Sequence, residues 1–143
     1  MGSYGADCFL IDASAAGRIH KAGSVEKWEP VLRQGRIGMC ASTEAELLVS
    51  ARSVEQYERM HESFGALYTR CGVPGDAWAR VHELQRGLAR AGCHRSAGVV
   101  DLLVAVTALH HRLTLLHYDR DFETIAEHTG LRTQWVAEPG GVD

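Results

Sequence analysis

The sequence predicts an α/β fold in which a central, mainly parallel β-sheet lies between two helix layers, as a three-layer α/β/α sandwich. Short apolar runs alternate with helical segments along the whole chain, and parallel strands need crossover connections and covered faces. One helical segment, 98–109, is apolar on nearly every side, as expected of a buried helix. With 143 residues, 45% of them hydrophobic, we expect a single domain over 1–143 with a flexible tail at 138–143.

The first third of the chain contains two of the predicted strands. Residues 8–11 are an apolar run that predicts a buried strand ending at Asp12, and a helix starts after it. A short helix is expected within 24–35, where Pro30 should shorten or kink it. Residues 36–41 have the composition of a second short strand.

The middle of the chain predicts a helical hairpin. Thr43 and Glu46 match a capping box, which would open a helix through Ala51. We expect residues 53–71 to continue as a helix, because apolar side chains recur there at spacings of three and four. These side chains are Tyr57, Met60, Phe64 and Leu67.

The last part of the chain repeats the alternation. A helix is predicted from Pro74 to Gly92, with Trp78 on its apolar face. It is followed by the buried helix 98–109, a strand at 113–118, a helix that Asp121 opens and a last strand at 131–136.

Acidic side chains follow two of the predicted strands. Ligands of parallel α/β sheets lie at the carboxyl ends of the strands, and Asp12 and Asp119 occupy such positions. Asp101 interrupts the most apolar helix, where an ionised carboxylate must pair, bind a metal or take up a proton. Glu46 and Asp121 also lie at helix starts that the topology can bring to the same place.

Each of these acids also has a local explanation. Asp12 is suited to cap the helix that follows it, and Glu46 to complete the capping box. Asp119 and Asp121 suit a turn and a helix start, and Asp101 a first helical turn, where acids complement the helix dipole.

Together the acids predict a site for Mg²⁺ or Mn²⁺, because hard cations prefer carboxylate ligands. The 15 basic and 18 acidic side chains give a net charge of −3 with neutral histidines, so bulk charge does not favour nucleic acid. Bound cations would instead draw phosphodiester oxygens to the site. Ser14 is placed to hydrogen-bond a carboxylate or a metal-bound water.

Other classes of site are disfavoured. The four cysteines form no Cys-x-x-Cys pair, which argues against a zinc ribbon or a thioredoxin-type site. Adjacent His110 and His111 point in different directions on a helix, so a zinc site with His117 is also disfavoured. No apolar run approaches the ~20 residues that cross a bilayer, and we expect no membrane association.

Four segments carry a resemblance to a known family. They are LIDAS (10–14), AELLVSAR (45–52), VVDLLVAVTAL (99–109) and LLHYDRDFETIAEHTGL (115–131). Their order over residues 10–131 resembles that of PIN-domain ribonucleases, specifically the VapC toxins of bacterial type II toxin–antitoxin modules.

The resemblance implies a PIN-type sandwich and a set of site residues. The family's four metal-site acids correspond to Asp12, Glu46, Asp101 and Asp119, with Asp121 as an accessory fifth. Glu46 is preferred because it directly precedes Leu-Leu, although Glu44 stays open as the alternative. His117 stands where many PIN domains have Ser or Thr.

The resemblance also implies the activity and the partners. We expect Mg²⁺- or Mn²⁺-dependent endoribonuclease cleavage of RNA, with tRNA or rRNA as target, leaving 5′-phosphate and 3′-hydroxyl ends. A homodimer, a cognate VapB antitoxin and a cytoplasmic location are expected as well.

Several questions stay open. Arginines could form an RNA-contacting rim or be merely solvated: Arg90, Arg95, Arg112, Arg120 and Arg132. The apolar face of 53–71 fits a core, a dimer seam or an antitoxin groove. Two rival functions are a non-catalytic binding module of the same fold and a phosphotransfer enzyme with Asp12 as nucleophile.

Overall fold

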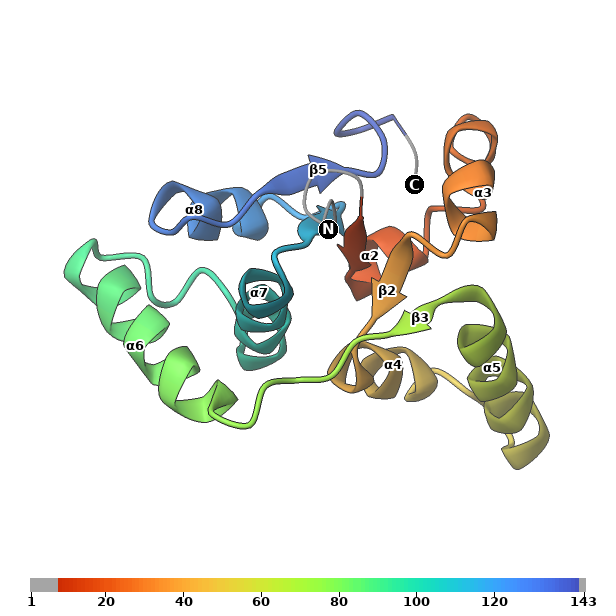
Figure 1. The fold of residues 1–143 in the computed structure, drawn as a ribbon, viewed down its shortest axis with the longest axis horizontal. Coiled ribbons are helices and arrows are strands. Elements are labelled where there is room, and N and C mark those ends of the chain that lie inside the picture. The colour runs from red at the N-terminus through yellow and green to blue at the C-terminus, as the bar shows by residue number, and fades with distance from the viewer. Residues whose placement is uncertain (1–7, 142–143) are drawn as a thin grey trace.

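The computed structural model describes residues 8–141, so residues 1–7 and 142–143 of the predicted domain and tail lie outside the described residues. Within this part of the chain, strands and helices alternate as predicted (Figure 1). The strands are β1 (Phe9–Ile11), β2 (Ile37–Met39), β3 (Thr69–Arg70), β4 (Thr114–His117) and β5 (Thr133–Trp135). The helices are α2 (Ala13–Ala16), α3 (Val25–Arg33), α4 (Ala41–Leu48), α5 (Val54–Leu67), α6 (Ala77–Arg90), α7 (Val99–His111) and α8 (Asp121–Glu127).

The five strands form one sheet in the order β3-β2-β1-β4-β5, and every neighbouring pair is parallel. β1 and β4 are central, with Leu10 opposite Leu115 and Ile11 opposite Leu116. Because all strands run the same way, their carboxyl ends meet at one edge. The predicted parallel sheet is confirmed.

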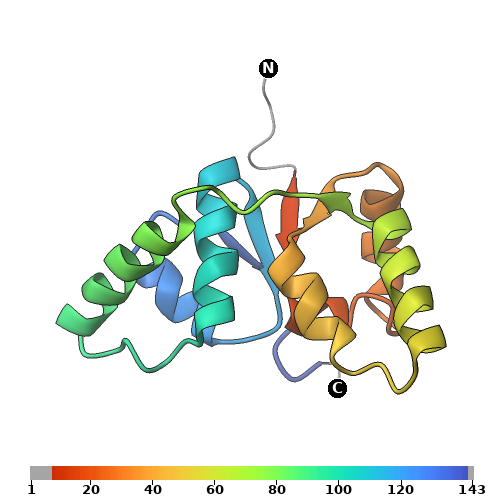
Figure 2. The same ribbon diagram turned by 90° about the horizontal axis from the view of Figure 1, so that it is seen from below.

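The two faces of the sheet carry separate hydrophobic clusters. Leu10 and Leu115 pack with α6, α7 and α8 on one face, whereas Ile11 and Leu116 pack with Trp28 of α3 on the other. This alternation follows from strand geometry, since successive side chains point to opposite faces. Figure 2 shows α6 and α7 on one side of the sheet and α3 and α5 on the other. The three-layer α/β/α sandwich is therefore confirmed.

The predicted helix over 53–71 is wrong at its end. Helix α5 stops at Leu67, Tyr68 is extended, and the chain then forms the edge strand β3 beside β2. Gly38 makes this pairing possible, because a Cβ there would lie 3.1 Å from the carbonyl oxygen of Thr69 and would overlap the sulfur of Cys71.

The predicted apolar face of α5 contacts the core only in part, through Phe64. No residue of this helix is buried; Tyr57 and Leu67 are exposed, and Met60 and Phe64 are half-buried. The buried aromatic side chain in this region is Tyr68, just after the helix.

Two further predictions about helices are wrong. Helix α4 begins at Ala41 with Cys40 as its N-cap, so Thr43 lies inside the helix and the predicted capping box does not form. Trp78 is 57% exposed, and Ala77 occupies the buried position at the start of α6. Helix α3, by contrast, continues through Pro30 to Arg33.

The end of the described chain folds back against β4. The backbone N–H of Gly140 donates to the hydroxyl of Tyr118 at 2.7 Å, and that of Gly141 donates to the Glu138 carbonyl. Across residues 8–141, no helix is both long enough and apolar enough to cross a membrane.

Candidate metal centre

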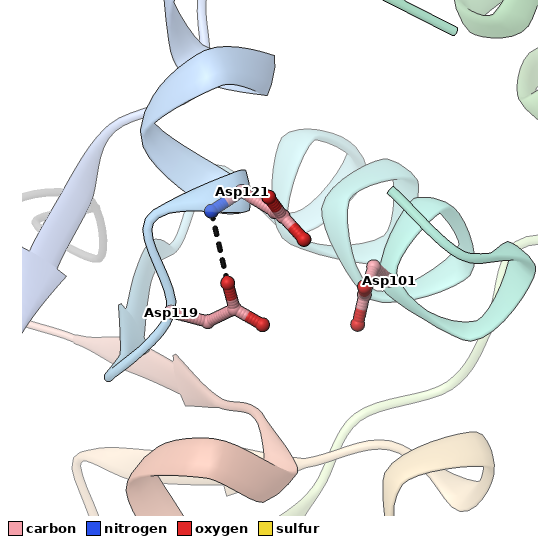
Figure 3. A group of neighbouring side chains, drawn as sticks. All are labelled: Asp101, Asp119 and Asp121. Carbon is pink, nitrogen blue, oxygen red and sulfur yellow. Dashed lines mark hydrogen bonds between the residues drawn. The ribbon is translucent and has the colours of Figure 1, made fainter. Parts of the chain in front are cut away.

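Three aspartates converge at the carboxyl edge of the sheet. One carboxylate oxygen from each of Asp101, Asp119 and Asp121 lies within 4.8 Å of the others (Figure 3). Asp101 comes from the first turn of α7, Asp119 from the loop after β4, and Asp121 from the start of α8. Two segments about twenty residues apart in sequence thus meet through the fold.

The loop after β4 has a fixed geometry. The backbone N–H of Asp121 donates to Oδ1 of Asp119 at 2.9 Å, and the N–H of Asp119 donates to Nδ1 of His117 at 3.0 Å. Figure 3 shows the other oxygen of Asp119 on the side that faces Asp101. Asp119 therefore stabilises the turn, as expected, and its second carboxylate oxygen is left for a ligand.

Asp101 is half-buried and also has a local role. Its Oδ2 accepts the backbone N–H of Gly98 at 3.3 Å, which helps to cap α7. Burial raises the pKa of Asp101, the Gly98 N–H opposes this, and the charges of Asp119, Glu46 and Asp121 raise the pKa further. Asp101 therefore both caps α7 and belongs to the acidic cluster.

Asp12 follows β1 and is 5% exposed. Its Oδ1 accepts hydrogen bonds from the Ser14 hydroxyl at 2.8 Å and from the Ala15 N–H at 3.3 Å, so it does cap α2. Burial raises its pKa to about 6; the bonds from Ser14 and Ala15 lower it, and the charge of Asp101 raises it. Asp12 lies outside the group of three but within electrostatic reach of it.

Glu44 and Glu46 point to different parts of the molecule. Glu44 is buried, and its carboxylate pairs with Nδ1 of His61 at 2.5 Å and with Nη1 of Arg70 at 3.7 Å. Glu46 is exposed, and its charge raises the pKa of Asp101. The acidic cluster therefore has Glu46, not Glu44, as its neighbour on α4.

Some of the arginines and histidines considered for the site lie away from the acids. Arg112 and Arg132 precede β4 and β5, and Nη2 of Arg132 donates to the Arg112 carbonyl at 2.8 Å. They are thus at the amino edge of the sheet, opposite the acids. His111 uses Nε2 to bond the carbonyl of Gly72, at 2.7 Å. Arg95 and Arg120 remain close to the acidic segments in sequence and are exposed.

The interaction between His117 and Glu123 was not predicted. Nε2 of His117 lies 2.7 Å from Oε2 of Glu123. A signal was present in the sequence, because a histidine that ends a largely apolar strand must find partners for both ring nitrogens once it is buried.

Comparisons with known proteins identify one family. The model of the PIN domain family matches residues 9–128. Ribonuclease VapC21 of Mycobacterium tuberculosis (strain ATCC 25618 / H37Rv) is 36% identical over 132 residues, which are 92% of this chain and 96% of that protein. Ribonuclease VapC18 of the same strain is 31% identical over 134 residues, 92% of this chain and 97% of that protein.

Solved structures share the fold at lower identity. DNA-bound VapBC from Salmonella typhimurium contains a chain with a TM-score of 0.74 and 19% identity, covering 91% of this chain and 98% of that one. VapBC-5 from Mycobacterium tuberculosis gives a TM-score of 0.60 and 24% identity, covering 90% and 97%.

Proposed function

Because the chain belongs to the PIN-domain family of VapC ribonucleases, we propose that it is an endoribonuclease toxin that cleaves RNA. The observation that supports this most directly is the convergence of Asp101, Asp119 and Asp121 at the carboxyl edge of the sheet. Its relatives are named ribonucleases, and an acidic edge that holds a divalent cation would be suited to phosphodiester chemistry.

The proposed metal centre uses the predicted acids. Asp12, Glu46, Asp101 and Asp119 would hold Mg²⁺ or Mn²⁺, with Asp121 as the accessory ligand. The donor set fits, since these cations prefer carboxylate oxygens and retain several waters. Mutual repulsion also supports the site: the pKa values of Asp12 and Asp101 are raised in part by neighbouring carboxylates, and a cation would relieve that repulsion.

A divalent cation bound there would act as a Lewis acid toward the scissile phosphate and lower the pKa of an attacking water. The chain itself supplies orientation. Ser14 holds the carboxylate of Asp12, and Asp121 holds one oxygen of Asp119, so that both acids meet the ligand in fixed positions. Such preorganisation spares the site from rearranging as charge develops on the phosphate.

The proposed partners and target rest on membership of the family. Several similar structures are VapBC toxin–antitoxin complexes, and we propose that a small VapB-like antitoxin neutralises this chain. Cleavage of tRNA or rRNA would inhibit translation and growth in the cytoplasm. A homodimer is proposed on the same family grounds.

A cleavage assay tests the activity. The purified chain should cut RNA in Mg²⁺ or Mn²⁺, EDTA should stop the reaction, and Asp101→Asn should be inactive while it unfolds at a similar temperature. Sequencing RNA 5′ ends after brief induced expression would identify the target. If the parent chain cuts no RNA and binds no metal at millimolar concentration, the rival reading as a non-catalytic binding module is favoured.

A further inference from the structure

His117 is the buried polar residue closest in sequence to Asp119 and Asp121. It ends β4, its side chain is 0% exposed, and its ring packs against Phe122 and Trp135 with centroid distances of 5.4 and 4.7 Å. A ring with two polar nitrogens is costly in such a place unless both find partners.

The two hydrogen bonds of this ring fix its tautomer. The backbone N–H of Asp119 can only donate, so Nδ1 of His117, 3.0 Å away, must be the acceptor. The proton of the neutral ring then lies on Nε2, which donates to Oε2 of Glu123 at 2.7 Å. Glu123 thus determines which nitrogen is free to accept from Asp119.

This chain of contacts ends at the acidic cluster. Glu123 orients His117, His117 holds the backbone of Asp119, and Oδ1 of Asp119 accepts from the N–H of Asp121. With its backbone and one oxygen held, Asp119 directs its other oxygen toward Asp101 (Figure 3). The two polar contacts that satisfy the buried ring are therefore also the contacts that link Glu123 to the acidic cluster.

We propose that His117 and Glu123 are positioning residues that hold Asp119 in the geometry that binds the divalent cation. This inference rests on the proposed metal centre and adds residues beyond the five acids. Substitution of a residue that hydrogen-bonds a metal ligand typically lowers metal affinity by about 10–100-fold.

Two amide substitutions separate positioning from packing. In His117→Asn, the side-chain oxygen can take the place of Nδ1 and still accept from Asp119. In His117→Gln, the amide nitrogen can reach Glu123, but no acceptor remains for Asp119. Both variants remove the ring, so a role in packing alone would affect them alike.

The readouts are Mn²⁺ affinity by calorimetry and the unfolding temperature of each variant. We expect His117→Gln to bind Mn²⁺ about 10-fold or more weakly than His117→Asn, with both destabilised to a similar extent. Equal affinities in the two variants would overturn the proposal. A parent chain that binds no Mn²⁺ would instead contradict the metal centre itself, so the two failures are distinguishable.

A milder pair of variants keeps the test decisive if the His117 variants do not fold. Glu123 is 37% exposed, so its replacement leaves the core intact. Glu123→Gln retains an acceptor for Nε2 and should bind Mn²⁺ like the parent, whereas Glu123→Ala should weaken binding several-fold. Glu127→Ala, an exposed change in the same helix, is the matched control. The proposal fails if Glu123→Ala binds Mn²⁺ as tightly as Glu127→Ala does.

Discussion

The hydroxyl of Ser14 lies 2.8 Å from Oδ1 of Asp12 and donates a hydrogen bond to it. The same hydroxyl oxygen accepts the backbone N–H of Tyr118 at 2.8 Å. One side chain thus joins the acid that follows β1 to the end of β4, next to Asp119. This arrangement ties the ends of the two central strands together, between Asp12 and the residue before Asp119.

Removing this hydroxyl should weaken cation binding near neutral pH. The bond from Ser14 lowers the pKa of Asp12, which burial raises to about 6. Ser14→Ala should therefore raise that pKa further and shift the pH midpoint of Mn²⁺ binding upward. Calorimetry between about pH 5 and 8 measures the midpoint, and Ser14→Thr, which keeps a hydroxyl, should behave like the parent. An unchanged midpoint in Ser14→Ala would contradict the role given to this bond.

Stability without metal should fall as the pH rises through the Asp12 transition. The folded-state pKa of Asp12, about 6, lies above the ordinary aspartate pKa of 3.8, so the folded state binds more protons between these pH values. This group alone should make the fold about 3 kcal/mol less stable at pH 7 than below pH 4. Urea unfolding in EDTA at a series of pH values measures the effect.

The control for this pH dependence is Asp12→Asn, which cannot titrate and should flatten the curve. Added Mg²⁺ should restore stability at pH 7 in the parent, because a ligand that binds only the folded state stabilises it. A parent curve identical to that of Asp12→Asn would show that Asp12 is not the group responsible.

Substitution of one glutamate of α4 should reduce activity, and substitution of the other should reduce stability. Glu46→Gln changes an exposed side chain and should abolish or strongly reduce RNA cleavage with little change in unfolding temperature. Glu44→Gln replaces the buried partner of His61, and should cost about 1–3 kcal/mol of stability while cleavage per folded molecule persists. Cleavage assays with thermal unfolding check both; the opposite pattern would make Glu44 the metal-site residue.

Gly38 should not tolerate a side chain. A Cβ there would meet the carbonyl of Thr69 at 3.1 Å and overlap the sulfur of Cys71, so Gly38→Ala should destabilise the β2–β3 pairing by about 1–3 kcal/mol. Gly87→Ala is the matched control: it lies in α6 with no atom within 4 Å of the added Cβ, and should stabilise by about 0.5–1 kcal/mol. Thermal unfolding measures the change in stability of both variants. Equal changes would mean that β3 can move to make room for the added methyl group at residue 38.

Much of the fold could be predicted because its signals are local. The apolar runs that became β1, β2 and β4 are bounded by polar residues, and α7 is apolar nearly all round. Strand β3 has two exposed residues and no apolar pattern; it forms because Gly38 lets the chain approach. The sequence around Thr43 matches a capping box, but α4 begins earlier, at Ala41, directly after β2. Thr43 therefore lies inside the helix and does not cap it.

The site was predictable only in part, for the same reason. The positions of Asp12 and Asp119 after strands follow from strand polarity, and Asp101 was recognisable from its cost in an apolar helix. The resemblance to the family already favoured Glu46 over Glu44. The pairing of Glu44 with His61 depends on how α4 packs against α5, which the sequence pattern does not show. The contact between His117 and Glu123 depends on how α8 packs against β4, so only the need for a partner could be foreseen.

The most direct test of the metal centre is a crystal of this chain soaked in Mn²⁺ and measured at the manganese absorption edge. We predict an anomalous difference peak between Asp101, Asp119 and Asp121, within coordinating distance of their carboxylate oxygens, and no such peak in crystals of Asp101→Asn. A well-ordered parent crystal with no anomalous peak among these acids would contradict the account.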